Sequence, residues 1–456
     1  MSYTSDSTII AQCTPQGSGA LALIRISGPD SIKIVDHIST LASKKKLVDC
    51  TTHTIHYGFV VDAQKTIVDS VMFLLMRGPR TFTGEDTVEI TCHNNPFLID
   101  SIIQLAIVNG AQLAQPGEFS QRSFLNDKLD LVQAEAINEL IHASSQVALK
   151  QALSQLDGSF SHWVAGIEKD LVKVLALSEA SFEFLDEEHA FVDQIKAIVT
   201  SIVKKVAEAK NTFDQQKQIR EGVRIAIVGS VNAGKSSLFN SLLNQKRAIV
   251  TNIAGTTRDA IEAGLYRNGN YWTLIDTAGL RQTDDIVEKE GIERSFEEAQ
   301  KADIIIMVLD QSRGLTVQEE AIYTKLYAEY NDKIIVVFNK SDLPTLISEK
   351  KYDAVLHLST KNNKTISILE DALEKKISNL YSNLASPFLL NKRHYTLLLS
   401  LEQKLNNIES MLTEDVAYEL LSHHIQDSLE CLTELTGKSI SEAGMDAVFK
   451  EFCVGK

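Results

Sequence analysis

Residues suited to binding a nucleoside triphosphate begin with the segment GSVNAGKS at 229–236, which fits the pattern G-x-x-x-x-G-K-[ST]. Glycines in this pattern let backbone N–H groups turn toward phosphate oxygens, and the following helix adds its positive N-terminal end. Lys235 is expected to reach the β- and γ-phosphates, and the Ser236 hydroxyl to ligate Mg²⁺. The alternative is a glycine-rich strand–helix turn without a ligand. It is disfavoured because an apolar strand-like run, VRIAIV, precedes the segment and a helix-like run follows it.

Three further segments follow in the order that a guanine-nucleotide site requires. DTAG at 276–279 ends an apolar run, so Asp276 is placed to hold Mg²⁺ through water and the Gly279 N–H to meet the γ-phosphate. NKSD at 339–342 ends another run, and a carboxylate at Asp342 accepts two parallel hydrogen bonds from guanine N1–H and its 2-amino group. Adenine offers no such pair, so the motif predicts GTP over ATP. Between these segments lies GTTRD at 255–259, where Thr257 supplies a second hydroxyl to Mg²⁺.

The predicted GTP-binding set lies in five loops, with Lys235 also assigned to catalysis. Its members are Asn232, Ala233, Gly234, Lys235, Ser236, Ser237, Thr251, Asn252, Ile253, Ala254, Gly255, Thr256, Thr257, Asp276, Thr277, Ala278, Gly279, Asn339, Lys340, Ser341, Asp342, Ser359 and Thr360. The position after DTAG, where a Ras-like GTPase has a water-orienting Gln, holds Leu280. Either another residue positions the water or hydrolysis is poor. Nearby acids are Asp284, Asp285, Glu288 and Glu290, each of which on its own indicates only a solvated acidic face.

The elements that must position these residues follow from the pattern of apolar runs. From Val223 onward, apolar strands alternate with helical patterns, which predicts a largely parallel α/β sheet with helices on both faces. Residues 1–118 carry short strand-like runs and turn signals, typical of a compact α+β domain. The stretches 119–215 and 381–456 have helical periodicity. We therefore expect a helical domain in two parts, interrupted by a P-loop α/β domain at 216–380. The alternative is a separate helical tail.

Composition limits the classes of function. The chain has 456 residues, too many for one ordinary core, and a net charge of −15, which disfavours stand-alone binding to nucleic acid. Five scattered cysteines without a CxxC pair argue against a zinc site and a disulfide framework. No apolar run approaches the roughly 20 residues of a membrane helix, and the first residues lack the features of a targeting segment. The expectation is a cytoplasmic protein without membrane contact.

Taken together, the motifs resemble the MnmE (TrmE) family of tRNA-modification GTPases over the whole chain. The resemblance rests on AIVTNIAGTTRD, IDTAGLR and VNAGKSSL in the middle, and on a chain that ends in FCVGK. N-terminal segments add RISG at 25–28, FTGED at 82–86, PGEF at 116–119 and LNDKLDL at 125–131. A P-loop alone would not be specific, but this combination is.

The resemblance implies a partnership and a chemistry. It implies a homodimer joined through N-terminal domains that bind folate. It also implies a flavin-dependent MnmG-like partner, forming a heterotetramer or larger complex that engages tRNA. Together they would attach an aminomethyl or carboxymethylaminomethyl group to C5 of the wobble uridine. The one-carbon donor would be 5-formyl- or 5,10-methylene-tetrahydrofolate.

The resemblance also assigns roles residue by residue. Asn232 matches a P-loop Asn that binds K⁺, and Thr251, Ile253 and Thr256 match the loop that completes this cage. A monovalent cation beside the β- and γ-phosphates neutralises developing charge as an arginine finger does. Glu288 matches a catalytic Glu that positions water, which would compensate for Leu280.

The folate site is implied in the same way. Arg25, Glu89, Lys128 and Lys456 match folate contacts, and Cys453 matches a C-terminal cysteine whose functional interpretation is a reactive, catalytic residue facing the folate. A Glu carboxylate accepts paired pterin N–H donors, and a basic side chain suits the anionic folate tail. On their own these would be ordinary salt-bridge residues and a buried or frayed thiol. One departure stands out: the family usually has GHGGP where this chain has CHNNP at 92–96, so Asn94 and Asn95 replace glycines.

Two other functions stay open at this level. A non-catalytic GTPase switch in ribosome assembly or cell-cycle control fits Leu280 equally well. A coiled-coil dimer with a vestigial GTPase fits poorly, because every nucleotide motif is intact. Folate binding by the isolated chain would separate the first alternative from the tRNA-modifying enzyme.

Overall fold

A computed structural model of the chain describes residues 7–183, 188–213, 216, 219–220, 222–243, 249–251, 261–276, 296–382, 388–412 and 418–455. Its contacts divide the chain into two compact units. The first comprises Met1–Asn138, Ser154–Val206 and Thr396–Lys456, and the second comprises Glu139–Leu153 and Ala207–Tyr395. Within the described ranges, no helix combines the length and apolarity that a membrane span requires.

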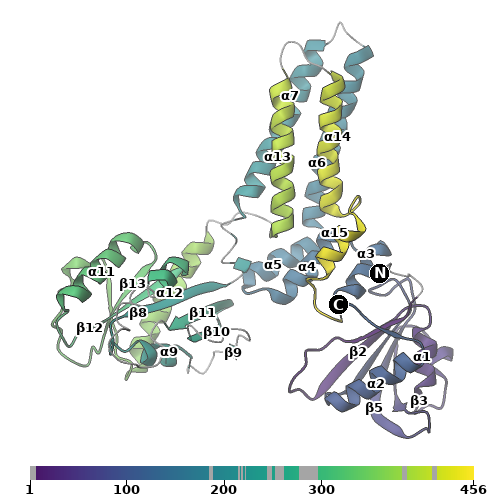
Figure 1. Cartoon of the computed structure of the whole chain (residues 1–456), viewed down its shortest axis with the longest axis horizontal. Coiled ribbons are helices and arrows are strands. Elements are labelled where there is room, and N and C mark those ends of the chain that lie inside the picture. Colours follow the sequence, from purple (N-terminus) through teal and green to yellow (C-terminus); the bar gives the residue numbers. More distant parts are fainter. Residues whose placement is uncertain are drawn as a thin grey trace. The chain divides into compact units, whose positions relative to one another are not determined.

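The first unit contains a seven-stranded, mostly antiparallel sheet (Figure 1). In spatial order its strands are β3 (Ser39–Leu41), β4 (Thr54–Val61), β5 (Ile67–Met76), β6 (Thr87–His93), β2 (Leu21–Ser27), β1 (Ile9–Gln12) and β7 (Gln112–Leu113). Alternation along β2 buries Ala22, Ile24 and Ile26 beneath the helices α1 (Ser31–His37) and α2 (Pro96–Val108). The opposite face carries Arg25 and Glu89, which are partners in the β2–β6 register.

The remaining helices come from both sides of the second sheet in the sequence; most belong to the first unit, whereas residues 146–153 belong to the second. The earlier ones are α3 (Glu118–Leu125), α4 (Leu131–His142), α5 (Gln146–Leu156), α6 (Ser159–Glu183) and α7 (Glu188–Asn211); the later ones are α13 (Lys392–Met411), α14 (Tyr418–Thr436) and α15 (Glu442–Phe449). Helices α6, α7, α13 and α14 run side by side in Figure 1. Ser178 in α6 hydrogen-bonds Ser422 in α14, and Thr200 in α7 donates to Glu409 in α13. The expected helical bundle with an inserted α/β domain is therefore confirmed.

The second unit is built on a seven-stranded sheet whose strands are parallel except β10. The order is β14 (Val355–His357), β13 (Ile334–Asn339), β12 (Ile304–Asp310), β8 (Val223–Gly229), β11 (Asn270–Asp276), β10 (Ile261–Arg267) and β9 (Ile249–Thr251). Helices α9 (Lys235–Leu243) and α12 (Asn363–Ser382) pack on one face, and α11 (Val317–Tyr330) packs on the other. The alternation predicted from Val223 onward is confirmed, although β9 and β10 were not predicted.

Two sets of hydrogen bonds join segments of the second unit that are distant in sequence. At the tip of the β10–β11 hairpin, Gln146 N donates to Gly269 O at 2.8 Å and Tyr271 N donates to Ser144 O at 2.7 Å. The buried Gln216 amide donates to Phe388 O and accepts from Leu390 N, both at 3.0 Å. Chain entry to the α/β domain and exit from it therefore lie next to each other.

Candidate functional site: a guanine-nucleotide site and a second, N-terminal site

The phosphate-binding loop begins where β8 ends and closes at the first turn of α9. Lys235, 7% exposed, donates from Nζ to the carbonyls of Gly229 and Ser230, both at 2.8 Å. Burial lowers the pKa of this ammonium, and the Asp276 carboxylate opposes part of the shift. The structure thus brings together two predicted site residues, Lys235 at the start of α9 and Asp276 at the end of β11.

Glycine is required at position 234 by both conformation and space. Its φ is +97°, and a Cβ atom there would lie 2.1 Å from Asn339 Nδ2. Asn339, 2% exposed at the end of β13, donates from that same nitrogen to Ala233 O at 2.8 Å. The NKSD segment therefore supports the phosphate loop directly. Asn232 also has a positive φ of 63° and stands exposed at the loop.

The base-recognition end gathers NKSD and the loop after β14. Asp342 Oδ1 accepts from Ser359 Oγ at 2.9 Å, and Oδ2 accepts from Lys361 Nζ at 3.2 Å. These donors lower the pKa of Asp342, with Ser359 contributing most. An ionised carboxylate is acceptor-only, which suits the two donors of the guanine edge.

Several predicted residues lie outside the described ranges. For Thr251, the structure describes only backbone pairing with Gly264 in the β9–β10 ladder. The predicted site residues outside these ranges are Asn252, Ile253, Ala254, Gly255, Thr256, Thr257, Thr277, Ala278, Gly279, Glu288 and Lys456. The predicted cation cage and water-positioning acid therefore remain predictions.

Oxygen donors for hard cations are nonetheless present at the described part of the loop. The Ser236 hydroxyl and the Asn232 amide are both exposed, and Asp276 lies buried at the end of β11. Hydroxyl, amide and carboxylate oxygens are the ligands that Mg²⁺ and K⁺ prefer over nitrogen or sulfur. The donor set fits the implied cations.

Asp310, which no sequence motif indicated, pairs with the predicted site residue Lys340. Lys340, with a φ of 63°, turns back so that its ammonium pairs with Asp310 Oδ2 at 2.5 Å. Burial opposes ionisation of Asp310, but donors from Lys340 and Ser312 prevail and lower its pKa. Asp310 ends the apolar strand β12, and a polar residue at that position was the available signal.

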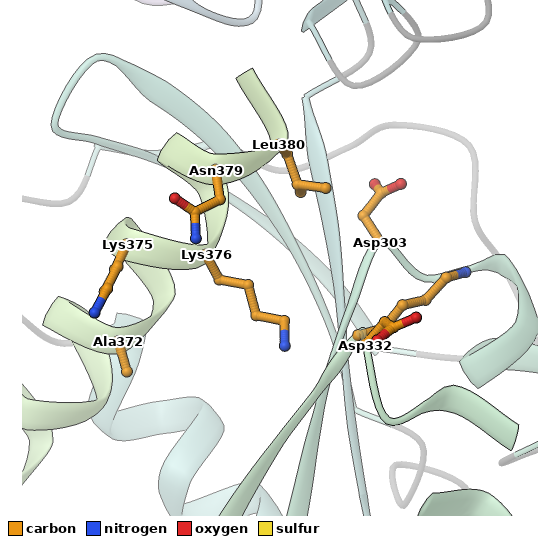
Figure 2. A pocket seen from close by; sticks show the side chains of 8 residues that line it. Asp303, Asp332, Ala372, Lys375, Lys376, Asn379 and Leu380 are labelled. Atoms are coloured by element: carbon orange, nitrogen blue, oxygen red, sulfur yellow. The ribbon is translucent and has the colours of Figure 1, made fainter. Parts of the chain in front are cut away.

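A separate hollow of about 530 Å³ opens at the other edge of the same sheet (Figure 2). Lys376 extends into it from α12 and donates to Ile334 O at 3.1 Å, and burial lowers its pKa. Asp303 and Asp332 precede β12 and β13, whereas the phosphate loop follows β8. Because the nucleotide motifs follow their strands, this hollow is distinct from the nucleotide site.

The predicted N-terminal site lies on the face of the first sheet opposite α1 and α2. Arg25 and Glu89 form an ion pair with a 2.8 Å Nη2–Oε1 distance, and each side chain is less than one-fifth exposed. The Arg25 guanidinium lies 5.5 Å from the ring centroids of both Phe82 and Phe119. Charged groups beside aromatic rings provide the hydrogen-bonding and stacking surfaces that a pterin ring requires.

Lys128 and the C-terminal tail approach the same domain. Lys128 Cε would contact a Cβ placed on Gly84, two residues after Phe82. In the tail, Cys453 is exposed and its carbonyl accepts from Gly117 N at 3.3 Å, while Gly455 O accepts from Cys13 Sγ at 3.1 Å. The structure therefore brings Arg25 and Glu89 into contact and places Lys128 beside the loop that carries Phe82.

The motifs FTGED and PGEF supply carboxylates to an ion-pair network that stabilises the N-terminal domain. Arg122, 7% exposed, donates to Glu85 at 3.0 Å and to Glu118 at 2.8 Å. The CHNNP departure is accommodated locally: Asn95 caps α2 with φ −120°, and Asn94 donates to Gly17 O. Neither asparagine is among the residues with positive φ, so this chain does not need glycine there.

A P-loop at the carboxyl edge of a parallel sheet, with NKSD beside it, defines the class as a P-loop guanine-nucleotide-binding protein. Comparison with known proteins gives the family. Residues 131–453 match the MnmE helical domain, and residues 8–128 match the N-terminus of the GTP-binding protein TrmE.

Relatives that match over nearly their whole length indicate the same family. The chain is 38% identical to the tRNA modification GTPase MnmE of Lachnoclostridium phytofermentans, with 98% of this chain and 99% of the relative covered. MnmE of Christiangramia forsetii is 35% identical and that of Listeria welshimeri 37%, each with the same coverage. The chain belongs to the MnmE family of tRNA modification GTPases.

The solved G domain of the T. maritima FeoB iron transporter is also similar over part of the chain. It is 24% identical with a TM-score of 0.25, and the match covers 34% of this chain and 98% of that one.

We predict that Gly234→Ala weakens GDP binding at least tenfold, because the added Cβ meets Asn339 and the backbone conformation is strained by roughly 1–3 kcal/mol. Titration with a fluorescent GDP measures the change. Gly314→Ala is the matched control, since a Cβ there meets nothing within 4 Å. Equal affinities for the two variants would contradict the packing of the loop on Asn339.

We also predict an order of cysteine alkylation at pH 8. Cys453 is exposed and should react first, whereas Cys92 is 1% exposed and burial raises the pKa of its thiol to about 11. The thiolate is the reactive form, so Cys92 stays protected until the protein is denatured. Mass spectrometry after timed iodoacetamide exposure gives the order. Early labelling of Cys92 would be inconsistent with the structure.

Proposed function

We propose that this chain is a potassium-activated GTPase that, with a flavin-dependent partner, modifies C5 of the wobble uridine of certain tRNAs. In this proposal a tetrahydrofolate bound near Arg25 and Glu89 supplies the one-carbon unit. The observation that carries the proposal is that one chain combines a guanine-nucleotide site with a largely buried Arg–Glu pair whose arginine lies beside two aromatic rings. Relatives of nearly identical length carry the name tRNA modification GTPase.

In this proposal, different residues of the chain bind the phosphates, hold the cations and orient the attacking water. Lys235 would bind the β- and γ-phosphates, and Ser236, Thr257 and Asp276 would hold Mg²⁺ directly or through water. Asn232, Thr251, Ile253 and Thr256 would hold K⁺. These cations, when bound, stabilise the negative charge that develops on the phosphates. Glu288 would orient the attacking water, a role that Leu280 cannot fill.

A homodimer is supported by an apolar surface on the first sheet. Ile55 is 62% exposed, and Tyr57 and Met72, partners in the β4–β5 register, are 51% and 41% exposed. They lie on the face opposite α1 and α2, which is also the face that carries Arg25. Neighbouring apolar side chains on a sheet face are typical of protein–protein contacts. We propose that a second copy covers this surface next to the folate.

We predict that GTP turnover is much faster in K⁺ than in Na⁺ at matched ionic strength. Asn232→Ala should abolish the difference, because the amide oxygen would ligate K⁺, and Glu288→Ala should slow turnover in both salts while GTP still binds. Steady-state phosphate release measures each rate. Asn240→Ala, an exposed asparagine on α9, is the control and should retain stimulation. Equal, slow turnover in both salts would contradict the potassium mechanism.

We predict that the purified chain binds 5-formyl-tetrahydrofolate and that Glu89→Gln weakens binding roughly tenfold or more, because a charge-assisted hydrogen bond is lost. Isothermal calorimetry measures the affinity. Arg80→Ala alters an exposed arginine elsewhere in the domain and should bind normally. Absence of binding by the unaltered chain would favour the non-catalytic switch instead.

A further inference from the structure

The second residue of the phosphate loop, Ser230, is held on three sides. Its backbone N–H donates to the Tyr323 hydroxyl at 2.6 Å, and its Oγ accepts from Arg313 Nη2 at 3.0 Å. Its carbonyl accepts from Lys235 Nζ at 2.8 Å. Three groups of one residue are therefore fixed by side chains from α9, α11 and the loop after β12.

Arg313 is itself rigidly held. Its two terminal nitrogens donate to the two carboxylate oxygens of Glu319, at 2.9 and 2.6 Å, a bidentate pairing. Glu319 also closes the capping box of α11 with Thr316. The hydrogen bonds from Arg313 lower the pKa of Glu319 to about 2, so the ion pair persists throughout the neutral range.

Tyr323 follows Glu319 by one helical turn, so both side chains share the face of α11 that meets the loop. Tyr323 is 3% exposed and packs in the core with Phe338 and Leu326. Burial raises the pKa of its phenol, which keeps the hydroxyl neutral. The Ser230 N–H thus meets a fixed acceptor.

The hydrogen bonds that hold Ser230 also affect the orientation of Lys235. An ammonium has three donors, and Gly229 and Ser230 take two of them, which leaves one to direct at a phosphate. The direction of that third N–H depends on where the Ser230 carbonyl stands. We propose that Arg313 and Tyr323 are positioning residues that act through Ser230 to aim Lys235 at the nucleotide phosphates. The proposal extends the nucleotide-binding part of the proposed function to residues outside the sequence motifs.

A double-mutant cycle tests the action through Lys235. The equilibrium affinity for guanosine 5′-(β,γ-imido)triphosphate is measured for the unaltered chain, Tyr323→Phe, Lys235→Ala and the double variant. Tyr323→Phe removes one hydrogen bond and should weaken binding roughly three- to tenfold. In the Lys235→Ala background the same change should weaken it less than twofold, because there is no ammonium left to aim. An equal factor in both backgrounds, or none in either, overturns the proposal.

Matched variants separate positioning from stability. Tyr327→Phe, one turn further along α11, removes a hydroxyl that bonds Asp353 instead, and should leave affinity unchanged. Arg313→Ala, at a side chain 39% exposed, gives the same cycle if Tyr323→Phe does not fold, and Arg313→Lys should recover part of the affinity. Because the cycle measures binding, it decides the proposal even if the unaltered chain hydrolyses no GTP, a result that would count against the proposed function alone.

Discussion

The nucleotide site depends on the close approach of the phosphate loop to the end of β13. Parallel pairing of β8 with β11 and β12, and of β12 with β13, brings the carboxyl ends of four strands to one edge. There the Asn339 amide supports Ala233, at a separation that leaves no room for a side chain at Gly234. Lys235, Asp276 and Asp342 all follow strands that end at this edge. The register of the strands therefore decides which loop residues can contact the nucleotide.

Within the described ranges, several buried charged side chains are paired or hydrogen-bonded. Lys235 donates two hydrogen bonds to backbone carbonyls, and Arg122 pairs with two carboxylates within the N-terminal domain. An isolated buried charge would cost several kcal/mol, whereas a paired and hydrogen-bonded one is tolerated. Arg25 and Glu89 follow the same rule, which makes their pairing both a structural solution and a means of keeping a polar site on an apolar sheet face.

The β10–β11 hairpin extends from the nucleotide edge of the α/β domain to the connection between α4 and α5 at 144–146. One end of β11 is Asp276, and the hairpin tip is hydrogen-bonded through Gly269 and Tyr271 to that segment. Antiparallel pairing over seven residues makes the hairpin a single stiff element. The hairpin therefore connects Asp276 to the residues that precede α5 through a ladder of backbone hydrogen bonds.

The sequence alone determined the class of site, because GSVNAGKS, DTAG and NKSD combine residue types whose chemistry is specific to guanine nucleotides. It also predicted the inserted α/β domain, since strand and helix periodicities differ along the chain. It did not reveal Arg313, Glu319 or Tyr323, which stand 83 to 93 positions from Ser230 and carry no local signal. Nor did it show that Arg25 faces Glu89, or that the backbone at Asn94 and Asn95 has a conformation that does not require glycine. Those facts depend on register and on long-range packing, which only the tertiary structure decides.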